Sequence, residues 1–197
     1  GITSNGGDIR LSGGTYHNSN LSWAYGTATS PHGISLTGTQ ISAGGGNISL
    51  RGASMTGNYL GHGVHLNGGA ISTTGGGFID IQGHSTGTSQ FSSGVAVLGA
   101  SITGGSTNNT RLIGTNASAG TEGRYQGVWL NNNLAGVSAL VNSTGGSVTV
   151  TGTGGGGGAS GVNYGVVIEN GLLSSGGTGT VNVTGTGGTT TGPNNAG

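Results

Sequence analysis

Residues 160–188 read "SGVNYGVVIENGLLSSGGTGTVNVTGTGG", and short apolar runs recur in this segment between glycines. The run GVVI at 165–168 places apolar side chains at i and i+2, and TVNV at 180–183 does the same. Period-two alternation is typical of a strand with one buried face. No segment of the chain has the i, i+3, i+4 spacing of a helix, so the stretch predicts strands.

The same arrangement repeats along the chain. A glycine precedes each first run, at intervals of 30, 31, 33 and 38 residues: Gly33, Gly63, Gly94, Gly127 and Gly165. A second run follows about 8 residues later and carries Ile41, Ile71, Ile102 and Leu173. A third run closes on a glycine, in segments 8–13, 47–52, 78–83, 109–114, 147–152 and 180–185. Length varies mainly in an insertion at 15–32 and near 133–142, as it does in loops on a fixed scaffold.

This repeat predicts an all-β fold, a right-handed single-stranded parallel β-helix or β-solenoid, with three short strands per rung and about five to six rungs. Residues 1–197 are expected to form a single repeat segment with glycine at the corners. Equivalent strands of successive rungs then stack at about 4.8 Å. Because both ends of the sequence fall inside the repeat, we expect the segment to be an excerpt of a longer array.

Such stacking predicts inward ladders of apolar residues. The first face stacks Ile34, Val64, Val95, Val128 and Val166, beside Leu36, Leu66, Val97, Leu130 and Ile168. The third face stacks Ile9, Ile48, Ile79, Thr110, Val148 and Val181, beside Leu11, Leu50, Ile81, Leu112, Val150 and Val183. Each apolar side chain of this size contributes about 1.5–3 kcal/mol when buried, which together offsets the ordering of a glycine-rich chain. On the outward side of the third face, Asp80 and Arg111 are expected to be neighbours that can pair.

The composition narrows the function classes. The 197 residues include 50 Gly and only 4% charged residues, and four Arg, without any Lys, balance four acids. Nucleic-acid binding needs clustered Lys and Arg, so no nucleic-acid partner is predicted. No run approaches the roughly 18 apolar residues of a membrane-spanning helix, so no membrane span is predicted.

The motifs "NYGVVIENGLLSSGGTGTVNVTGTGG" and "GDIRLSGG" resemble the passenger repeats of filamentous-haemagglutinin-like and autotransporter-type bacterial surface adhesins. The resemblance covers nearly the whole chain. It implies a β-helical stalk that is exported to the cell exterior and that serves adhesion or builds filaments. The family offers no catalytic residues to carry over, and the amino-terminal secretion module of such proteins is not part of this sequence.

A polysaccharide-cleaving enzyme is the catalytic alternative, since such enzymes use several carboxylates on one face of a β-helix. The acids Asp8, Asp80, Glu122 and Glu169 fall in different units, and only the first two share a face. We therefore predict no enzyme, no catalytic residue and no cofactor.

The histidines are candidates for a metal site. His32 is expected one rung below His62, and His65 follows in the same run. A metal needs ligands that converge within about 2.1 Å of the ion, and a vertical histidine pair supplies two. We expect instead a polar stack at a turn, and predict no metal site. The glycine runs are not predicted to cradle phosphate, because neither a helix nor a Lys follows them.

Aromatic residues form the candidate contact surface for a glycan or another chain. Five precede a leading glycine and are expected along one edge, two more lie in the insertion, and one faces outward from a first run: Tyr25, Tyr59, Phe91, Tyr125, Tyr164, Tyr16, Trp23 and Trp129. Aromatic edges can stack on sugars or pack against a neighbouring filament. The alternative is that the rings cover the core beneath a loop. Trp129, beside Val167 of the following rung, is expected to make lateral or interchain contacts.

Together these features predict a structural extracellular filament or adhesin stalk that stacks end to end and displays loops. Its expected partner is itself, by head-to-tail or lateral assembly, since an open sheet edge is a template for another chain. The alternative is an adhesin that binds surface glycans through the aromatic edge.

Overall fold

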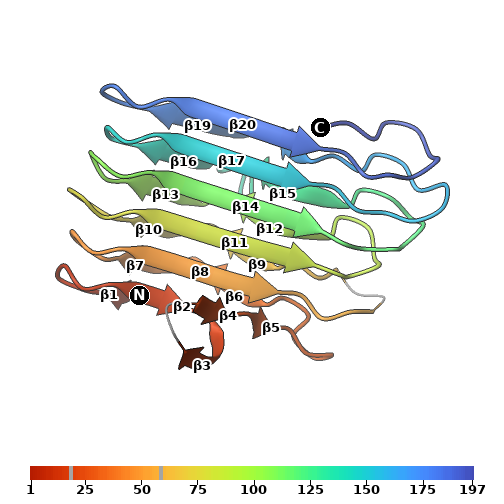
Figure 1. Ribbon diagram of the computed structural model, residues 1–197, viewed down its shortest axis with the longest axis horizontal. Coiled ribbons are helices and arrows are strands. Elements are labelled where there is room, and N and C mark those ends of the chain that lie inside the picture. The colour runs from red at the N-terminus through yellow and green to blue at the C-terminus, as the bar shows by residue number, and fades with distance from the viewer. Residues whose placement is uncertain (18–19, 58–59) are drawn as a thin grey trace.

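Figure 1 shows the computed structural model of the chain, in which the regular elements are β-strands arranged in stacked rungs. The structure describes residues 1–17, 20–57 and 60–197, and the side chains of residues 14–21 lie outside this description. The rungs rise from the red amino-terminal end to the blue carboxyl-terminal end in Figure 1. The predicted parallel β-helix with three strands per rung is confirmed, with about 5 turns.

Neighbouring strands in the three main sheets are parallel and join equivalent segments of successive rungs. The first sheet contains β6 (Ile34–Thr37), β9 (Val64–Asn67), β12 (Ser93–Leu98), β15 (Gln126–Asn131) and β18 (Val166–Ile168). The second sheet contains β1 (Ile2–Thr3), β7 (Gln40–Ser42), β10 (Ala70–Ser72), β13 (Ser101–Gly104), β16 (Ala139–Ser143) and β19 (Gly171–Ser175). The third sheet contains β2 (Ile9–Leu11), β8 (Ile48–Ala53), β11 (Ile79–Ser85), β14 (Thr110–Asn116), β17 (Val148–Thr153) and β20 (Val181–Thr186).

The predicted ladders are confirmed, because the strand registers place equivalent residues directly above one another. In the first sheet Val64 pairs with Val95, which pairs in turn with Val128, and all three side chains are fully buried. The third-sheet ladder has the predicted order: Ile9, Ile48, Ile79, Thr110, Val148 and Val181. These ladders and their second-sheet counterpart form one continuous core.

The second-sheet ladder includes a rung that the repeat alignment did not assign. Val141 of β16 stacks between Ile102 and Leu173, so the order is Ile41, Ile71, Ile102, Val141 and Leu173. The extra residues of this unit lie before β16, in segment 132–138, where the other rungs have a short turn. The core therefore keeps its register, and the insertion lies on the surface.

The insertion in the first unit contains strands of its own. Strands β3 (Gly13–His17) and β4 (Asn20–Ser22) form an antiparallel pair, and β3 lies below the first rung in Figure 1. Strand β5 (Ala24–Tyr25) then rejoins the third sheet, where Ala24 pairs with Gly52. The expectation that Gly13 closes the first unit is wrong, because Ala24 takes the equivalent position after this antiparallel pair.

The leading and closing glycines are not corners, which corrects the prediction. Gly83 lies inside β11 and Gly94 inside β12, and neither has a positive φ. A Cβ on Gly83 would overlap the carbonyl oxygen of Gly94, so the third and first sheets meet here backbone to backbone. Left-handed glycines such as Gly99 and Gly75 occupy the other two corners instead. We call the line of facing glycines the glycine seam.

Beyond the glycine seam, the loops after β8, β11, β14, β17 and β20 project to the same side of the coil (Figure 1). We call these stacked loops, at 54–57, 60–62, 86–92, 117–125, 154–164 and 187–196, the loop lobe. Its interior contains buried polar side chains: Ser54, Ser92, Ser118, Ser160 and Asn163. The amide of Asn163 accepts the N–H of Tyr125 at 3.2 Å and donates to Asn195 Oδ1 at 3.0 Å. Hydrogen bonds rather than apolar ladders thus hold this part of the molecule together.

Candidate functional site

The predicted aromatic contact residues do not line up along one edge. Tyr125 is fully buried in the loop lobe, where its hydroxyl donates to the backbone oxygen of Thr88. Burial raises the pKa of this phenol. The expectation of a surface contact at Tyr125 is therefore wrong, and the alternative of a ring beneath a loop describes it.

The aromatic rings do not form one edge because each ring lies at a different number of residues from its leading glycine. Neighbouring residues of an extended chain point to opposite sides. Phe91, Tyr125 and Tyr164 lie three, two and one residues before Gly94, Gly127 and Gly165, so equivalent rungs aim them differently. Phe91 and Tyr164 are half-buried.

The aromatic residues of the amino-terminal insertion lie elsewhere. Tyr25 in β5 is 71% exposed. Trp23 is half-buried and packs under the guanidinium of Arg51, whose Cζ lies 4.3 Å from the ring centroid. Tyr16 is a residue of β3, but its side chain lies outside the part of the chain that the structure describes. Tyr59 lies outside that part entirely.

Trp129 points outward from β15 beside Val167 of β18, as predicted. Its ring centroid lies 6.0 Å from that of Phe91 and 6.5 Å from that of His62. Ala96 lies between Trp129 on the rung above and His65 on the rung below, yet it has no exposed surface. Aromatic rings therefore cover the outer face of the first sheet at this point.

Phe91 reaches Trp129 from an unusual backbone conformation. Four residues, each three positions before a leading glycine or its equivalent, have φ of 64°, 61°, 60° and 60°: Phe91, Arg124, Val162 and Asn194. Left-handed φ is uncommon for residues other than glycine and asparagine, and is costly for a β-branched residue. The guanidinium of Arg124 lies 4.8 Å from the Phe91 ring centroid.

Three imidazoles stack beside Trp129. The His32 and His62 ring centroids lie 5.1 Å apart with planes 8° apart, which confirms the predicted vertical stack. His65 stacks with both, at 4.7 Å from His32 and 5.1 Å from His62. The Nδ1 of His32 accepts the backbone N–H of His62, and the Nδ1 of His62 accepts that of Ser93 at 3.1 Å.

These contacts fix the histidines as neutral rings. Burial, and then the charges of His65 and His32, hold the pKa of His62 well below 6.5. Burial, and then the charge of His32, lowers the pKa of His65 to about 4. In residues 1–17, 20–57 and 60–197, no three His, Cys, Asp or Glu side chains are grouped so as to hold a metal ion. The stack packs as a set of aromatic rings, in which the Nδ1 atoms of His32 and His62 accept backbone N–H groups and the Nδ1 of His65 lies 3.3 Å from the Ser35 hydroxyl.

A cleft opens on the outer face of the first sheet, at the carboxyl ends of its strands. It has a volume of about 410 Å³, and we call it the Asn/Trp cleft after its lining: Asn67, Leu98, Trp129, Asn131, Asn132, Asn133 and Leu134. Strand register stacks Asn67, Leu98 and Asn131 directly above one another. The lining contains one indole, four amides and two leucines, and none of its residues carries a charge.

The insertion at 132–138 forms one wall of this cleft. The Asn133 side-chain oxygen accepts the N–H groups of Ala135 and Val137, both at 3.0 Å, which closes the segment into a compact turn. The Asn133 amide also packs on the turn that contains Gly99, in the rung below. A Cβ added to Gly99 would lie only 2.7 Å from Asn133 Nδ2. The sequence pattern located this insertion but did not reveal its role; the signal was the run NNN at 131–133, which begins two residues after Trp129.

Glu169 fixes the indole from the rung above. Its Oε2 accepts the Trp129 Nε1–H at 3.1 Å and the Asn131 amide at 2.9 Å. Asn131 also accepts an amide hydrogen bond from Asn170 at 2.9 Å. Trp129 and Asn131 are thus held in one orientation before anything enters the cleft.

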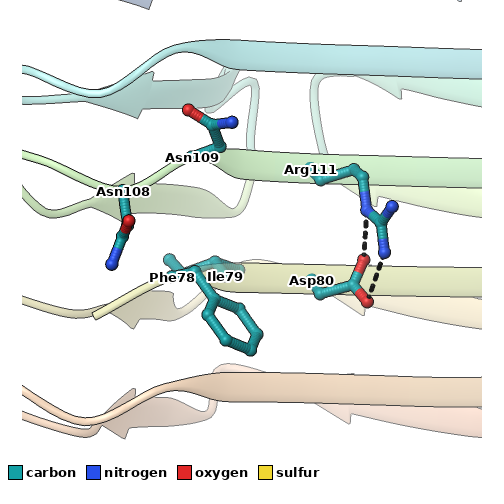
Figure 2. A pocket seen from close by; sticks show the side chains of 6 residues that line it. All are labelled: Phe78, Ile79, Asp80, Asn108, Asn109 and Arg111. Carbon is teal, nitrogen blue, oxygen red and sulfur yellow. Dashed lines mark hydrogen bonds and ion pairs between the residues drawn. The ribbon is translucent and has the colours of Figure 1, made fainter. Parts of the chain in front are cut away.

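A second cleft, of about 350 Å³, lies on the outer face of the third sheet (Figure 2). It is lined by Phe78, Ile79, Asp80, Asn108, Asn109 and Arg111. In Figure 2, Arg111 reaches from β14 to Asp80 on β11, and the Phe78 ring lies below them. The predicted pair is confirmed as a two-point contact, with Arg111 Nε and Nη2 each 2.9 Å from an Asp80 oxygen.

Phe78 interrupts a polar ladder that runs along the start of the third sheet. Asn47 donates its N–H to Asp8, Phe78 donates its N–H to Asn47 Oδ1, and Ser147 donates its N–H to Asn109 Oδ1. An aromatic ring cannot accept the N–H of the next rung in this way. Phe78 is instead 38% exposed beside the ion pair.

The four carboxylates have separate partners on separate rungs. Two form ion pairs, in which Asp8 lies 2.6 Å from Arg10 and Asp80 lies 2.9 Å from Arg111. The other two accept hydrogen bonds of 3.1 Å, Glu122 from the N–H of Gln90 and Glu169 from the indole of Trp129. Each carboxylate is therefore engaged with a cation or a hydrogen-bond donor.

Comparison of the chain with protein-family models, with curated proteins and with solved structures gave no match. The described residues include no helical segment of the length and apolarity that a membrane crossing requires.

Proposed function

We propose that this chain is a structural β-solenoid segment of an extracellular bacterial filament or adhesin stalk, which stacks end to end and displays loops. The observation that carries the proposal is the parallel β-solenoid itself, in which each sheet grows by adding an equivalent strand in the same register. In the described chain, β18, β19 and β20 each pair with a neighbour on one side only. Their inward residues Ile168, Val181 and Val183 are 42%, 41% and 47% exposed.

A further rung in the same register would bury these side chains and pair the free backbone groups. That rung can come from the same polypeptide or from another copy of the chain. Burial of each side chain is favourable by about 25 cal/mol per Å² of apolar surface. Extracellular use fits a chain with four Arg and no Lys, because such a surface offers few cleavage sites to proteases that cut after basic residues.

The test is the effect of an inward charge on assembly between copies. Val183→Lys places an ammonium group on the inner ladder of β20, a device by which natural edge strands avoid pairing. Asn182→Lys adds the same charge to the outward face of the same strand. Sedimentation over a range of concentrations should show assembly by the parent chain and the Asn182 variant but not by the Val183 variant. A parent chain that stays monomeric at high concentration contradicts assembly between copies.

Polysaccharide cleavage is the weaker candidate, because the only carboxylate that lines a described cleft, Asp80, is bound to Arg111. Turnover of a polysaccharide by the parent chain that is lost in Asp80→Asn would favour the enzyme instead. Glycan recognition is favoured by a different observation, the uncharged lining of the Asn/Trp cleft.

A further inference from the structure

We propose that the Asn/Trp cleft binds a neutral oligosaccharide. The site lies on the outer face of the first sheet and is lined by residues of β9, β12, β15 and the following segment, none of them on the last rung, so it does not depend on end-to-end stacking. Its volume of about 410 Å³ is within the range of small-ligand pockets, about 300–1,000 Å³.

The first argument is the chemistry of the lining. A pyranose ring presents C–H groups on its faces and hydroxyl groups around its rim. The Trp129 indole offers an apolar face to the C–H groups, and the indole is held in position by its hydrogen bond to Glu169 at 3.1 Å. Asparagine amides offer the hydroxyl groups a donor and an acceptor side by side, which matches a pair of adjacent hydroxyls.

The second argument is that several of these amides are free. Within the described residues, the side chains of Asn67 and Asn132 make no hydrogen bond, and neither does the Nδ2 of Asn133. The Asn133 oxygen is occupied by its own turn, so the group that this lining residue has left to offer a ligand is the Nδ2 donor. Polar groups left unpaired around a fixed indole are suited to a polar, uncharged ligand.

The third argument concerns charge. No Arg, Asp or Glu lines the cleft. A sulfated or carboxylated sugar, or a nucleic acid, would need cationic partners that the lining does not offer. A neutral saccharide needs none, which is why we assign it rather than a charged glycan.

The chain contains two tryptophans, so Trp23→Phe leaves Trp129 as the single reporter of the cleft. This variant is titrated separately with cellohexaose, maltohexaose, mannohexaose and, as the charged counterpart, a heparin hexasaccharide, while tryptophan fluorescence is recorded. We expect at least one neutral hexasaccharide to change the emission saturably, and heparin to leave it unchanged. No change with any neutral sugar up to about 10 mM, well above the Kd of a weak millimolar site, overturns the proposal.

The decisive variant is Asn133→Asp in the same background. It keeps an oxygen that accepts the Ala135 and Val137 N–H groups, and it replaces the Nδ2 donor by a second carboxylate oxygen, which also adds a negative charge. We expect an affinity at least about tenfold lower, with an unchanged thermal unfolding midpoint as evidence that the turn persists. Asn108→Asp adds the same charge in the second cleft, on the third sheet, and should bind like the parent.

Two other outcomes would also overturn the assignment. Equal affinity of the Asn133 variant would mean that sugar binds elsewhere. If no sugar binds but Trp129→Ala lowers the mass measured by sedimentation, the cleft is a lateral contact between copies of the chain.

Discussion

Gly83 of β11 and Gly94 of β12 face each other so closely that no side-chain atom fits between their backbones. Gly83→Ala would press a methyl group onto the Gly94 carbonyl oxygen and the Val95 side chain. Both neighbours belong to a sheet that is fixed from above and below, so they cannot move apart locally. We expect a loss of at least about 3 kcal/mol in the free energy of unfolding, measured by urea titration followed by circular dichroism.

Gly45→Ala is the matched comparison, because a Cβ there meets nothing within 4 Å and its φ is not positive. It should change the unfolding free energy by no more than about 0.5 kcal/mol. If the two variants lose the same stability, the glycine seam is not a close backbone contact.

The ladders were predictable because they follow from spacing alone. Once strands stack, residues such as Val64 and Val95 in equivalent positions of a period-two run must lie above one another. The role of the glycines was not predictable in this way. Glycine serves both left-handed turns and close backbone approach, and a sequence does not show which, so Gly83 and Gly99 look alike until two sheets are placed.

The candidate site was predictable only in part. The outward direction of Trp129 follows from its place between Val128 and Leu130. The burial of Tyr125 depends on a polar interior formed by loops from several rungs, with Asn163 as its partner. Loop packing has no period, and so the sequence could not reveal which aromatic rings are exposed.

The Asp80–Arg111 pair should contribute little to stability despite its geometry. The Arg111 side chain is 48% exposed, so solvent screens the attraction, and exposed pairs are worth about 0–1 kcal/mol. A double-mutant cycle with Asp80→Asn and Arg111→Gln should give a coupling of that size at low salt. The coupling should fall toward zero in about 1 M NaCl, where the Debye length is about 3 Å.

A coupling that survives high salt would show that the pair is shielded from solvent. The cleft of Figure 2 would then be less open than its exposed Phe78 ring indicates. Asp8→Asn removes the carboxylate that pairs with the exposed Arg10. Its effect gives the reference for an ion pair that is open to solvent.

Val162 is held at φ 60°, a conformation that is costly for a β-branched residue. Asn194 occupies the equivalent place one rung later with the same φ, and asparagine tolerates it. Val162→Asn should therefore raise the free energy of unfolding by about 1 kcal/mol. Val167→Asn, in a strand with ordinary backbone angles, should lower it. A loss of stability in both variants would mean that the Val162 side chain contributes more by packing than its backbone costs.

The histidine stack predicts a stability that falls as the pH falls. His62 and His65 stay neutral in the folded chain because their pKa values are lowered, the latter to about 4. In the unfolded chain both take up protons near the ordinary pKa of about 6.5. Below that pH the unfolded state binds more protons than the folded state, so stability decreases, and the loss attributable to His65 ends only near pH 4.

His62→Gln removes one of these protonations and uses the residue that the chain has at the equivalent position, Gln126. Between pH 7 and pH 5, the parent should lose about 2 kcal/mol more stability than this variant. The measurement is the urea midpoint at each pH. His62→Gln/His65→Gln should remove a further loss of similar size, because both rings are kept neutral by burial. Equal pH dependence in the parent and the single variant would show that His62 is protonated in the folded chain, which its place between two other imidazoles and the Ser93 N–H opposes.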